Sequence, residues 1–318
     1  MSEEVVIGVL ALQGAFEEHQ SCLESADADG DPSLPMVRTV QVRTPAQLEG
    51  LSGIVLPGGE STSMGLIGAQ DGMWDALTKF VQSGKPTWGT CAGMVLLAER
   101  CVGGSAVIEN GQSLIGGLDI LVCRNYFGSQ ISSFEMATPC PPKSDLATAD
   151  AAAADAAAAD ATAADTSDYP GIFIRAPAIL NVGPGVKILG KVDATPSRQA
   201  AVVLRELERK IDAGEDVVNM GVVDALVRST GQDGAQGIGY IEVKKDEAGA
   251  ISAAEEKKDA AERPHNLTLP GAADGTNARE VICAVRKDNL LCTAFHPELT
   301  RDHRWHSYFN DMVKASLR

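Results

Sequence analysis

The sequence predicts an α/β fold: an open, mostly parallel sheet with helices on both faces, formed by a single domain over residues 1–318 that carries two insertions. Strand-like and helix-like runs alternate along the chain, which is the pattern of parallel strands joined by helical crossovers. Loops follow three of the strands at the edge where open parallel sheets place their chemistry. With 318 residues and 44% hydrophobic content, the chain can bury a core of this size.

The first predicted unit is the strand VVIGVLAL at residues 5–12, followed by a loop at Gln13-Gly14 and the helix AFEEHQSCLESA at residues 15–26. The apolar run is typical of a buried strand. It is only eight residues long and follows Glu3 and Glu4, so it is neither a membrane span nor a signal peptide with a basic start. Seven scattered cysteines are typical of a reducing compartment, so a cytoplasmic protein with no membrane association is expected.

Further units repeat the order of strand and helix. GIVLPG at residues 53–58 predicts a strand, and MWDALTKFVQSG at residues 73–84 predicts the helix after it. KPTWGT at residues 85–90 predicts another strand, and AGMVLLAERC at residues 92–101 predicts another helix. The final segment, from residue 280, predicts a hairpin of strands, a short loop and a closing helix.

Two stretches interrupt this pattern and are interpreted as insertions. An Ala- and Asp-rich stretch lies at about residues 138–168, where Asp recurs at every fifth residue from Asp150 to Asp165. On a helix, five residues advance about 140° beyond a full turn, so these carboxylates would spiral round the axis and leave no apolar face. The longer stretch, at about residues 197–278, has helical spacing in VVLRELERKI and a strand-like GIGYIEVKK, and it is too long for an ordinary connection.

The net charge and the spacing of the histidines bear on whether the chain binds nucleic acid or a metal ion. The formal net charge of −16 argues against nucleic acid, because phosphate binding requires clustered Lys and Arg. His303 and His306 are one helical turn apart, but no cysteine or carboxylate set completes a ligand sphere, so neither a metal nor another cofactor is expected. His19 and His265 are interpreted as surface or structural residues, although His19 follows the loop after the first strand.

Cys91 is the candidate nucleophile. It lies between two glycines in GTCAG, directly after a predicted strand, and the same arrangement with serine is a nucleophile elbow. A cysteine at the start of a helix is favoured as thiolate by the helix dipole and by backbone N–H groups. The other six cysteines are interpreted as small buried apolar residues.

A cysteine nucleophile needs a base and a group that orients the base. His296 lies in AFHPELT, at the end of an apolar strand, and Pro297 favours extended geometry at His296. Residues two apart on an extended segment point to the same side, so Glu298 is expected to reach the His296 ring and hold its tautomer.

The run LPGGEST supplies the remaining part of such a site. Two glycines after a strand allow the backbone to approach a ligand closely and to present N–H groups to a developing oxyanion. Gly59 and Ala92, the residue after the nucleophile, are the expected donor pair. Taken alone, this run also fits a simple turn.

Together, these motifs resemble those of the triad-type, or class I, glutamine amidotransferases. Within that group, the chain is similar to the glutaminase subunits of pyridoxal 5′-phosphate synthases. The narrower resemblance rests on six ordered blocks that cover nearly everything outside the insertions: GVLALQGAFEEH, LPGGESTSM, GTCAGM, GGLDILVCRNYFGSQISSFE, FIRAP and FHPELTRDHRWHSYF.

The resemblance implies a flavodoxin-like fold and the hydrolysis of L-glutamine to L-glutamate and ammonia, with Cys91 as nucleophile, His296 as base and Glu298 as its orienter. It also implies delivery of ammonia to a β/α-barrel synthase subunit, in a hetero-oligomer that makes pyridoxal 5′-phosphate (vitamin B6). The positions that match the family's substrate-binding residues are Gly59, Glu60, Ser61, Arg124, Ile174 and Arg175. An arginine fork is the usual partner of a substrate carboxylate.

Two features depart from the family pattern. The family usually has a second arginine where this chain has Ser129, so a contact to substrate, loop or partner is expected to be lost or replaced. Both insertions also fall between Cys91 and His296. They would interfere with coupling to a synthase partner only if they extend from the face of the domain that binds it.

Three other functions remain open from the sequence. The chain would be a glutaminase that serves another synthase, as in histidine or purine biosynthesis, if LALQGAFEEH and RNYFGSQ were not specific. It would be a non-catalytic assembly subunit if the triad residues took no part in catalysis. A redox-sensing cysteine would use the same elbow, but it has no need of His296 and Glu298.

Overall fold

The computed structural model describes most of the chain outside the two predicted insertions. The described residues are 4–28, 35–103, 114–128, 133–142, 168–212, 227–230, 236–239, 269 and 278–317. The Asp150 to Asp165 repeat, Ser129 and His265 lie outside them, as do most of the residues from 213 to 277.

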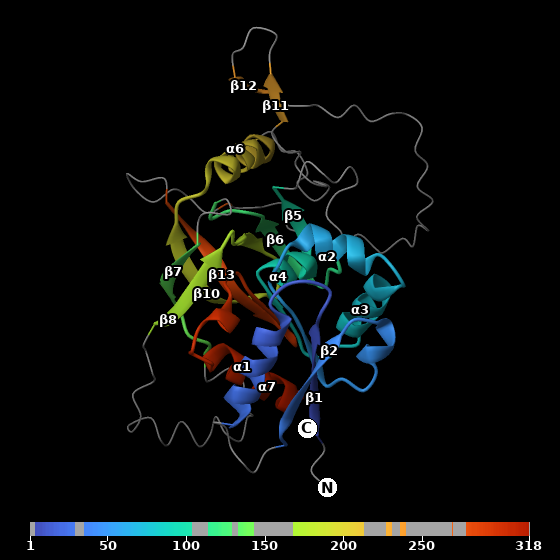
Figure 1. Ribbon diagram of the computed structural model, residues 1–318. Helices are drawn as coiled ribbons and strands as arrows, with labels where there is room; N and C mark the ends of the chain where they lie inside the picture. Colours follow the sequence, from blue (N-terminus) through green and yellow to red (C-terminus); the bar gives the residue numbers. More distant parts are fainter. Residues whose placement is uncertain are drawn as a thin grey trace.

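A ten-stranded sheet organises the fold, in the order β2-β1-β3-β4-β14-β13-β9-β6-β5, with β10 beside β13 (Figure 1). Strands β2 to β14 in this order are parallel neighbours, as are β5 and β6, whereas β13, β9 and β10 pair antiparallel. The predicted open, mostly parallel sheet is therefore confirmed. The strands are β1 (Val5–Leu10), β2 (Val37–Val42), β3 (Gly53–Leu56), β4 (Thr87–Thr90), β5 (Ala98–Val102), β6 (Leu118–Cys123), β9 (Ala178–Val182), β10 (Lys187–Ala194), β13 (Arg279–Lys287) and β14 (Leu290–Thr293).

Two antiparallel pairs lie outside this sheet. Strands β7 (Ser133–Thr138) and β8 (Tyr169–Ile174) flank the predicted first insertion. Strands β11 (Val227–Thr230) and β12 (Gln236–Gly239) pair within the predicted second insertion.

Helices cover both faces of the sheet. On one face, α1 (Phe16–Ala28) packs beside α7 (Arg304–Ser316), and Trp88 of β4 contacts the His19 and Phe309 rings of these helices. Gly89, the next residue of β4, faces the opposite side, where α4 (Ala92–Leu97) lies. The chain passes from β1 to β2 in one direction and from β3 to β4 in the other, so right-handed crossovers place α3 (Met73–Gln82) on the face opposite α1.

The helix predicted at residues 92–101 is wrong in its second half. The helix α4 ends at Leu97, and Ala98 to Val102 form β5, which pairs with β6. Every residue of α4 is buried, so its apolar run has no helical periodicity to mark an end. Pairing with β6 then overrides the helix propensity of Ala, Glu and Arg.

The helix α6 (Arg198–Asp212) begins the predicted second insertion and includes the VVLRELERKI segment. Its residues Ala200, Val203, Leu204 and Leu207 are buried in the main core, at the i, i+3, i+4, i+7 spacing of one helix face. The first part of this stretch therefore packs as part of the fold. None of the helices among the described residues has both the length and the apolar character needed to cross a bilayer.

Candidate active site

Three loops meet at the carboxyl ends of the neighbouring strands β1, β3 and β4. Between β1 and β3 the strand order reverses, and open α/β sheets bind ligands at such a point. The loops after these two strands contact each other directly. The Ala15 N–H donates to the Gly58 carbonyl at 3.3 Å, and the Glu60 N–H donates to Gln13 Oε1 at 2.7 Å.

The elbow at Cys91 depends on its flanking glycines. A Cβ on Gly93 would lie 1.9 Å from the Leu56 carbonyl oxygen, and one on Gly89 would lie 2.5 Å from the Gly93 carbonyl oxygen. Helix α4 therefore packs against β3 at Gly93 and against β4 at Gly89, at distances that only glycine allows. Cys91 itself has φ 46° and ψ −101°, a backbone strain typical of functional sites, and its N–H donates to the Thr293 carbonyl at 2.8 Å.

His296 lies three residues beyond the end of β14, next to Cys91. Its N–H donates to the Ile172 carbonyl of β8 at 2.8 Å, which ties the base to the strand pair β7–β8. Its ring nitrogen Nδ1 is 2.7 Å from Glu298 Oε1, and both side chains are buried. The expected extended geometry through Pro297 is wrong, because a 3-10 helix, η4 (Pro297–Leu299), begins there, and this turn brings Glu298 back to the ring.

Burial and charge act in opposite directions on the pKa values of this pair. Burial lowers the pKa of His296, but the negative charge and hydrogen bond of Cys91, with those of Glu298, raise it well above its ordinary value. Burial raises the pKa of Glu298, but His19 and His296 together bring it below its ordinary value. His296 is thus held as a strong base with an ionised carboxylate behind it.

The other predicted site residues surround this pair. Ile174 places its carbonyl oxygen 4.0 Å from Cys91 Sγ, and Arg175 follows it with a positive φ of 45°. The Arg124 Nη2 lies 3.5 Å from Glu60 Oε1 and 3.3 Å from Thr62 Oγ1. Its Nη1 is buried and has no hydrogen-bond partner within the described part of the chain.

Glu60 has a structural task that the sequence did not suggest. Its two carboxylate oxygens accept from the N–H groups of Thr62 and Ser63 at 3.0 and 2.7 Å, which caps α2 (Ser61–Gly68). Burial raises the pKa of Glu60, but these hydrogen bonds lower it overall. The Glu60 carboxylate is therefore ionised. It caps the start of α2 and lies beside Arg124.

Sequence reasoning missed His19 and His306, which are fully buried behind Glu298. Of the two alternatives expected for His19, a surface or a structural residue, burial excludes the first, and the spacing of the buried positions His19, Cys22, Leu23 and Ala26 could have revealed its face. Among the described residues, no group of three or more His, Cys, Asp or Glu could hold a metal ion. The six cysteines other than Cys140 are free thiols and are buried.

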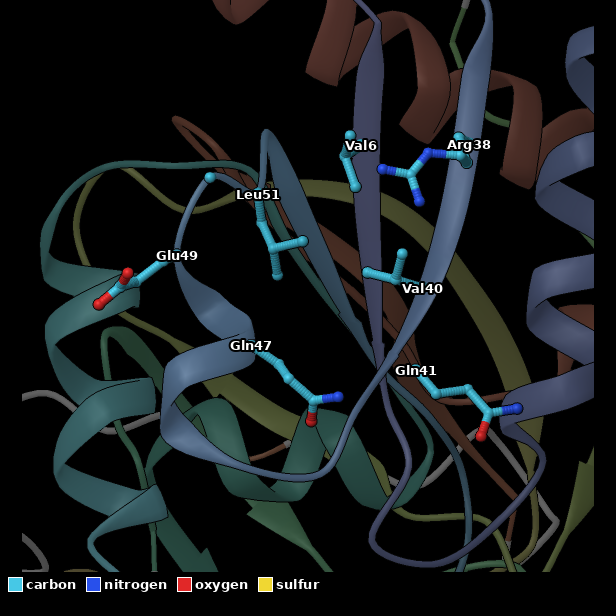
Figure 2. A pocket seen from close by; sticks show the side chains of 8 residues that line it. Val6, Arg38, Val40, Gln41, Gln47, Glu49 and Leu51 are labelled. Atoms are coloured by element: carbon cyan, nitrogen blue, oxygen red, sulfur yellow. The ribbon is translucent and has the colours of Figure 1, made fainter.

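A pocket elsewhere contains none of these residues. Figure 2 shows Val6, Val40 and Leu51 lying between β1, β2 and the segment that includes the 3-10 helix η1 (Pro45–Leu48), with Arg38 and Glu49 at the margin. It mixes apolar and exposed charged side chains, and its lining includes no cysteine or histidine. The candidate active site is therefore defined by the Cys91 elbow and its surroundings.

The Gly58→Ala substitution is expected to lower kcat by about 100-fold, because a 1 Å displacement of a catalytic group can cost that much. The new Cβ would lie 2.3 Å from Cε1 and 2.7 Å from Nδ1 of the His296 ring, so the ring must move. The measurement is the turnover of L-glutamine, the substrate that the sequence resemblance implies, together with the thermal unfolding midpoint. Gly84→Ala is the control, because it adds strain at φ 77° with nothing within 4 Å of the new Cβ. An unchanged kcat in Gly58→Ala would contradict the close packing of this loop on His296.

Comparisons with known proteins identify the family. The model of the SNO glutamine amidotransferase family matches residues 9–208. A probable pyridoxal 5′-phosphate synthase subunit PDX2 from Arabidopsis thaliana is 35% identical over 98% of this chain and 86% of its own length. The pyridoxal 5′-phosphate synthase subunit PdxT from Streptomyces griseus is 30% identical over 99% of both chains, and the PdxT of Deinococcus radiodurans is 41% identical over 63% of this chain and 86% of its own length.

A solved structure described as a glutamine amidotransferase has a similar fold. It superposes with a TM-score of 0.54, covering 96% of this chain and 98% of its own, at 24% sequence identity. At that identity, the likeness supports the fold alone.

Proposed function

Because the chain belongs to the SNO glutamine amidotransferase family, we propose that Cys91, His296 and Glu298 form the catalytic triad with which it hydrolyses L-glutamine to L-glutamate and ammonia. One observation carries the assignment of roles: His296 Nδ1 lies 2.7 Å from Glu298 Oε1 while the same ring interacts with Cys91 at the elbow. Nucleophile, base and orienter are thereby joined in one chain of contacts.

The first half of the reaction forms a thioester. The Cys91 sulfur attacks the side-chain amide carbon of glutamine, and the N–H groups of Gly59 and Ala92 hold the oxyanion that develops. His296 takes the thiol proton and gives it to the departing nitrogen, so that ammonia leaves as the carbon–nitrogen bond breaks. Glu298 keeps the His296 proton on Nδ1, which leaves Nε2 to exchange protons with the reacting atoms.

The second half consumes water. His296 accepts a proton from a water molecule as the water oxygen attacks the thioester carbon, and the same proton returns to the Cys91 sulfur as the carbon–sulfur bond breaks. Glutamate is released and the triad is restored. Every step uses groups of this chain, the substrate and water.

Substrate binding is assigned to Gly59, Glu60, Ser61, Arg124, Ile174 and Arg175. The buried Nη1 of Arg124 has no partner in the described segments, which supports a role for its guanidinium, because a buried donor without a partner is costly unless a ligand satisfies it. Glu60 acts through the helix cap it forms and through its contact with Arg124.

The ammonia goes to a synthase. Relatives that match nearly the whole chain are named as subunits of pyridoxal 5′-phosphate synthase, so this chain is the glutaminase subunit of such a synthase. The finer assignment is a hetero-oligomer with a β/α-barrel subunit that uses the ammonia to make pyridoxal 5′-phosphate. Because free ammonia production would waste glutamine, turnover is expected to rise when the partner binds.

The test is glutamate release from L-glutamine by the purified full chain, measured with and without a pyridoxal 5′-phosphate synthase barrel subunit. The expected result is turnover that rises with the partner, with stoichiometric ammonia. Turnover that ignores the barrel subunit but responds to another ammonia-using synthase would overturn the choice of partner. No turnover under either condition would favour a non-catalytic assembly subunit.

A further inference from the structure

Two buried histidines that the proposed mechanism does not use lie directly behind Glu298. His19 comes from α1 and His306 from α7, and neither side chain has exposed surface. His19 Nε2 lies 3.3 Å from Glu298 Oε2 and 3.1 Å from Thr90 Oγ1, while His19 Nδ1 lies 3.1 Å from His306 Nε2. His19 thus touches the orienter of the base and the residue that precedes the nucleophile.

The positions of the protons follow from these contacts. Burial lowers the pKa of His19, against the opposite effect of Glu298, and lowers the pKa of His306, which favours neutral rings that each carry one N–H. The ionised Glu298 only accepts, so His19 must carry its proton on Nε2. His19 Nδ1 then accepts, and His306 must donate from Nε2. This leaves His306 Nδ1 as a bare acceptor, which agrees with its having no hydrogen-bond partner in the described residues.

The contact between His19 and the second carboxylate oxygen of Glu298 links His19 to the triad. Glu298 Oε1 receives the His296 proton, but Oε2 is buried and accepts no well-aligned hydrogen bond within the described part of the chain. His19 Nε2 lies 3.3 Å from this oxygen and 3.1 Å from the Thr90 hydroxyl oxygen, so its one N–H has two acceptors within reach, and a small tilt of the ring would aim it at Oε2. Catalytic hydrogen bonds are often long without substrate and tighten in the reacting complex.

We propose that His19 is a positioning residue of the glutaminase reaction: its Nε2–H holds Glu298 Oε2 and Thr90, and so aligns the base and the nucleophile strand, while His306 holds His19 in the required tautomer. This inference rests on the proposed triad. Glu298 is on η4, Thr90 at the end of β4, and His19 and His306 on the two helices that cover this face. A single imidazole therefore connects three elements whose relative placement sets the distance from Cys91 to His296.

Three substitutions at position 19 separate positioning from packing. His19→Leu fills the space without any donor. His19→Gln can place an amide N–H where Nε2 was, whereas His19→Asn reaches only the position of Nδ1 and is the matched polar control. Steady-state glutamine hydrolysis is measured on the full chain, under conditions in which the wild-type protein turns over, together with the thermal unfolding midpoint.

The expected result is a kcat lower by about tenfold or more in His19→Leu and His19→Asn, because a hydrogen bond to a charged group is lost. KM should stay within about twofold, since His19 is buried and is not one of the assigned substrate-binding residues, and His19→Gln should recover most of kcat. A purely structural role would lower the unfolding midpoint in all three variants without rescue by Gln.

Two outcomes would overturn the inference while leaving the proposed function intact. One is a wild-type kcat in His19→Leu, and the other is a His19→Gln variant no better than His19→Asn. The second comparison decides the matter even if His19→Leu fails to fold. A wild-type protein without glutaminase activity, or an active Cys91→Ala variant, would instead contradict the proposed function itself.

Discussion

Replacing Cys91 with alanine should lower kcat for glutamine hydrolysis by at least about 10⁴-fold, because removing the nucleophile of a triad leaves only the residual effect of binding and oxyanion stabilisation. The fold should survive, since the side chain is buried and alanine keeps its Cβ. The measurement is glutamate release, with the thermal unfolding midpoint as a check on folding. Cys283→Ala is the matched control, because Cys283 is a buried free thiol on β13 with no part in the proposed site.

The same variant has a second readout at His296. The charge and hydrogen bond of Cys91 help to raise the pKa of His296 against the effect of burial. With alanine at position 91, burial is opposed by Glu298 alone, so the pKa of His296 should fall. Titration of the histidine ring signals by NMR measures this directly. Turnover near wild type, or an unchanged pKa of His296, would contradict the role given to Cys91.

Glu298→Gln should lower kcat by about 10³- to 10⁴-fold, close to the effect of an Asp-to-Asn change in a serine-protease triad. Glutamine keeps the shape of the side chain but brings a donor and an acceptor where the carboxylate has two acceptors. If the new NH₂ faces His296, the ring must carry its proton on Nε2 and can no longer accept one from Cys91.

The opposite orientation is also unfavourable. If the new NH₂ faces His19, then His19 and His306 must both move their protons to Nδ1, and the His306 N–H is left buried without a partner. Both orientations therefore disturb the network. Turnover and thermal unfolding measure the effect, and Glu280→Gln is the control because that exposed carboxylate pairs only with Lys191 among the contacts described. A loss of less than about tenfold would show that Glu298 does not hold the tautomer of His296.

Much of the fold could be predicted because its strands are continuous apolar runs separated by loops of glycine and polar residues. The first strand, the strand before Cys91 and the closing hairpin with its helix occur where the pattern indicated them. The end of α4 could not be predicted, because a helix buried on every side shows no periodicity. Whether α6 belongs to the core depends on a surface made by distant strands, which local spacing does not reveal.

The candidate site divides in the same way. Cys91 could be identified from its glycines, because Gly89 allows strand and helix to approach closely at the turn, although Gly93 is also required for packing against Leu56 of β3. His296 and Glu298 could be paired from their spacing, although the contact is made by a 3-10 turn instead of an extended segment. The sequence could not connect His19 to His296 and Glu298. His19 and Glu298 are 279 residues apart in the sequence, and they come close only when α1 packs on the sheet.

The sequence by itself determined the class of sheet, the family, and the identity of the candidate nucleophile, base and orienter, because each depends on short local patterns and on their order along the chain. The tertiary structure decided what surrounds them: the helix cap formed by Glu60, the Arg124 nitrogen that has no hydrogen-bond partner among the described residues, and the two histidines behind Glu298. These depend on side chains from separate elements meeting in a buried space. There, an unpaired hydrogen-bonding group is costly, and the placement of each proton constrains the next.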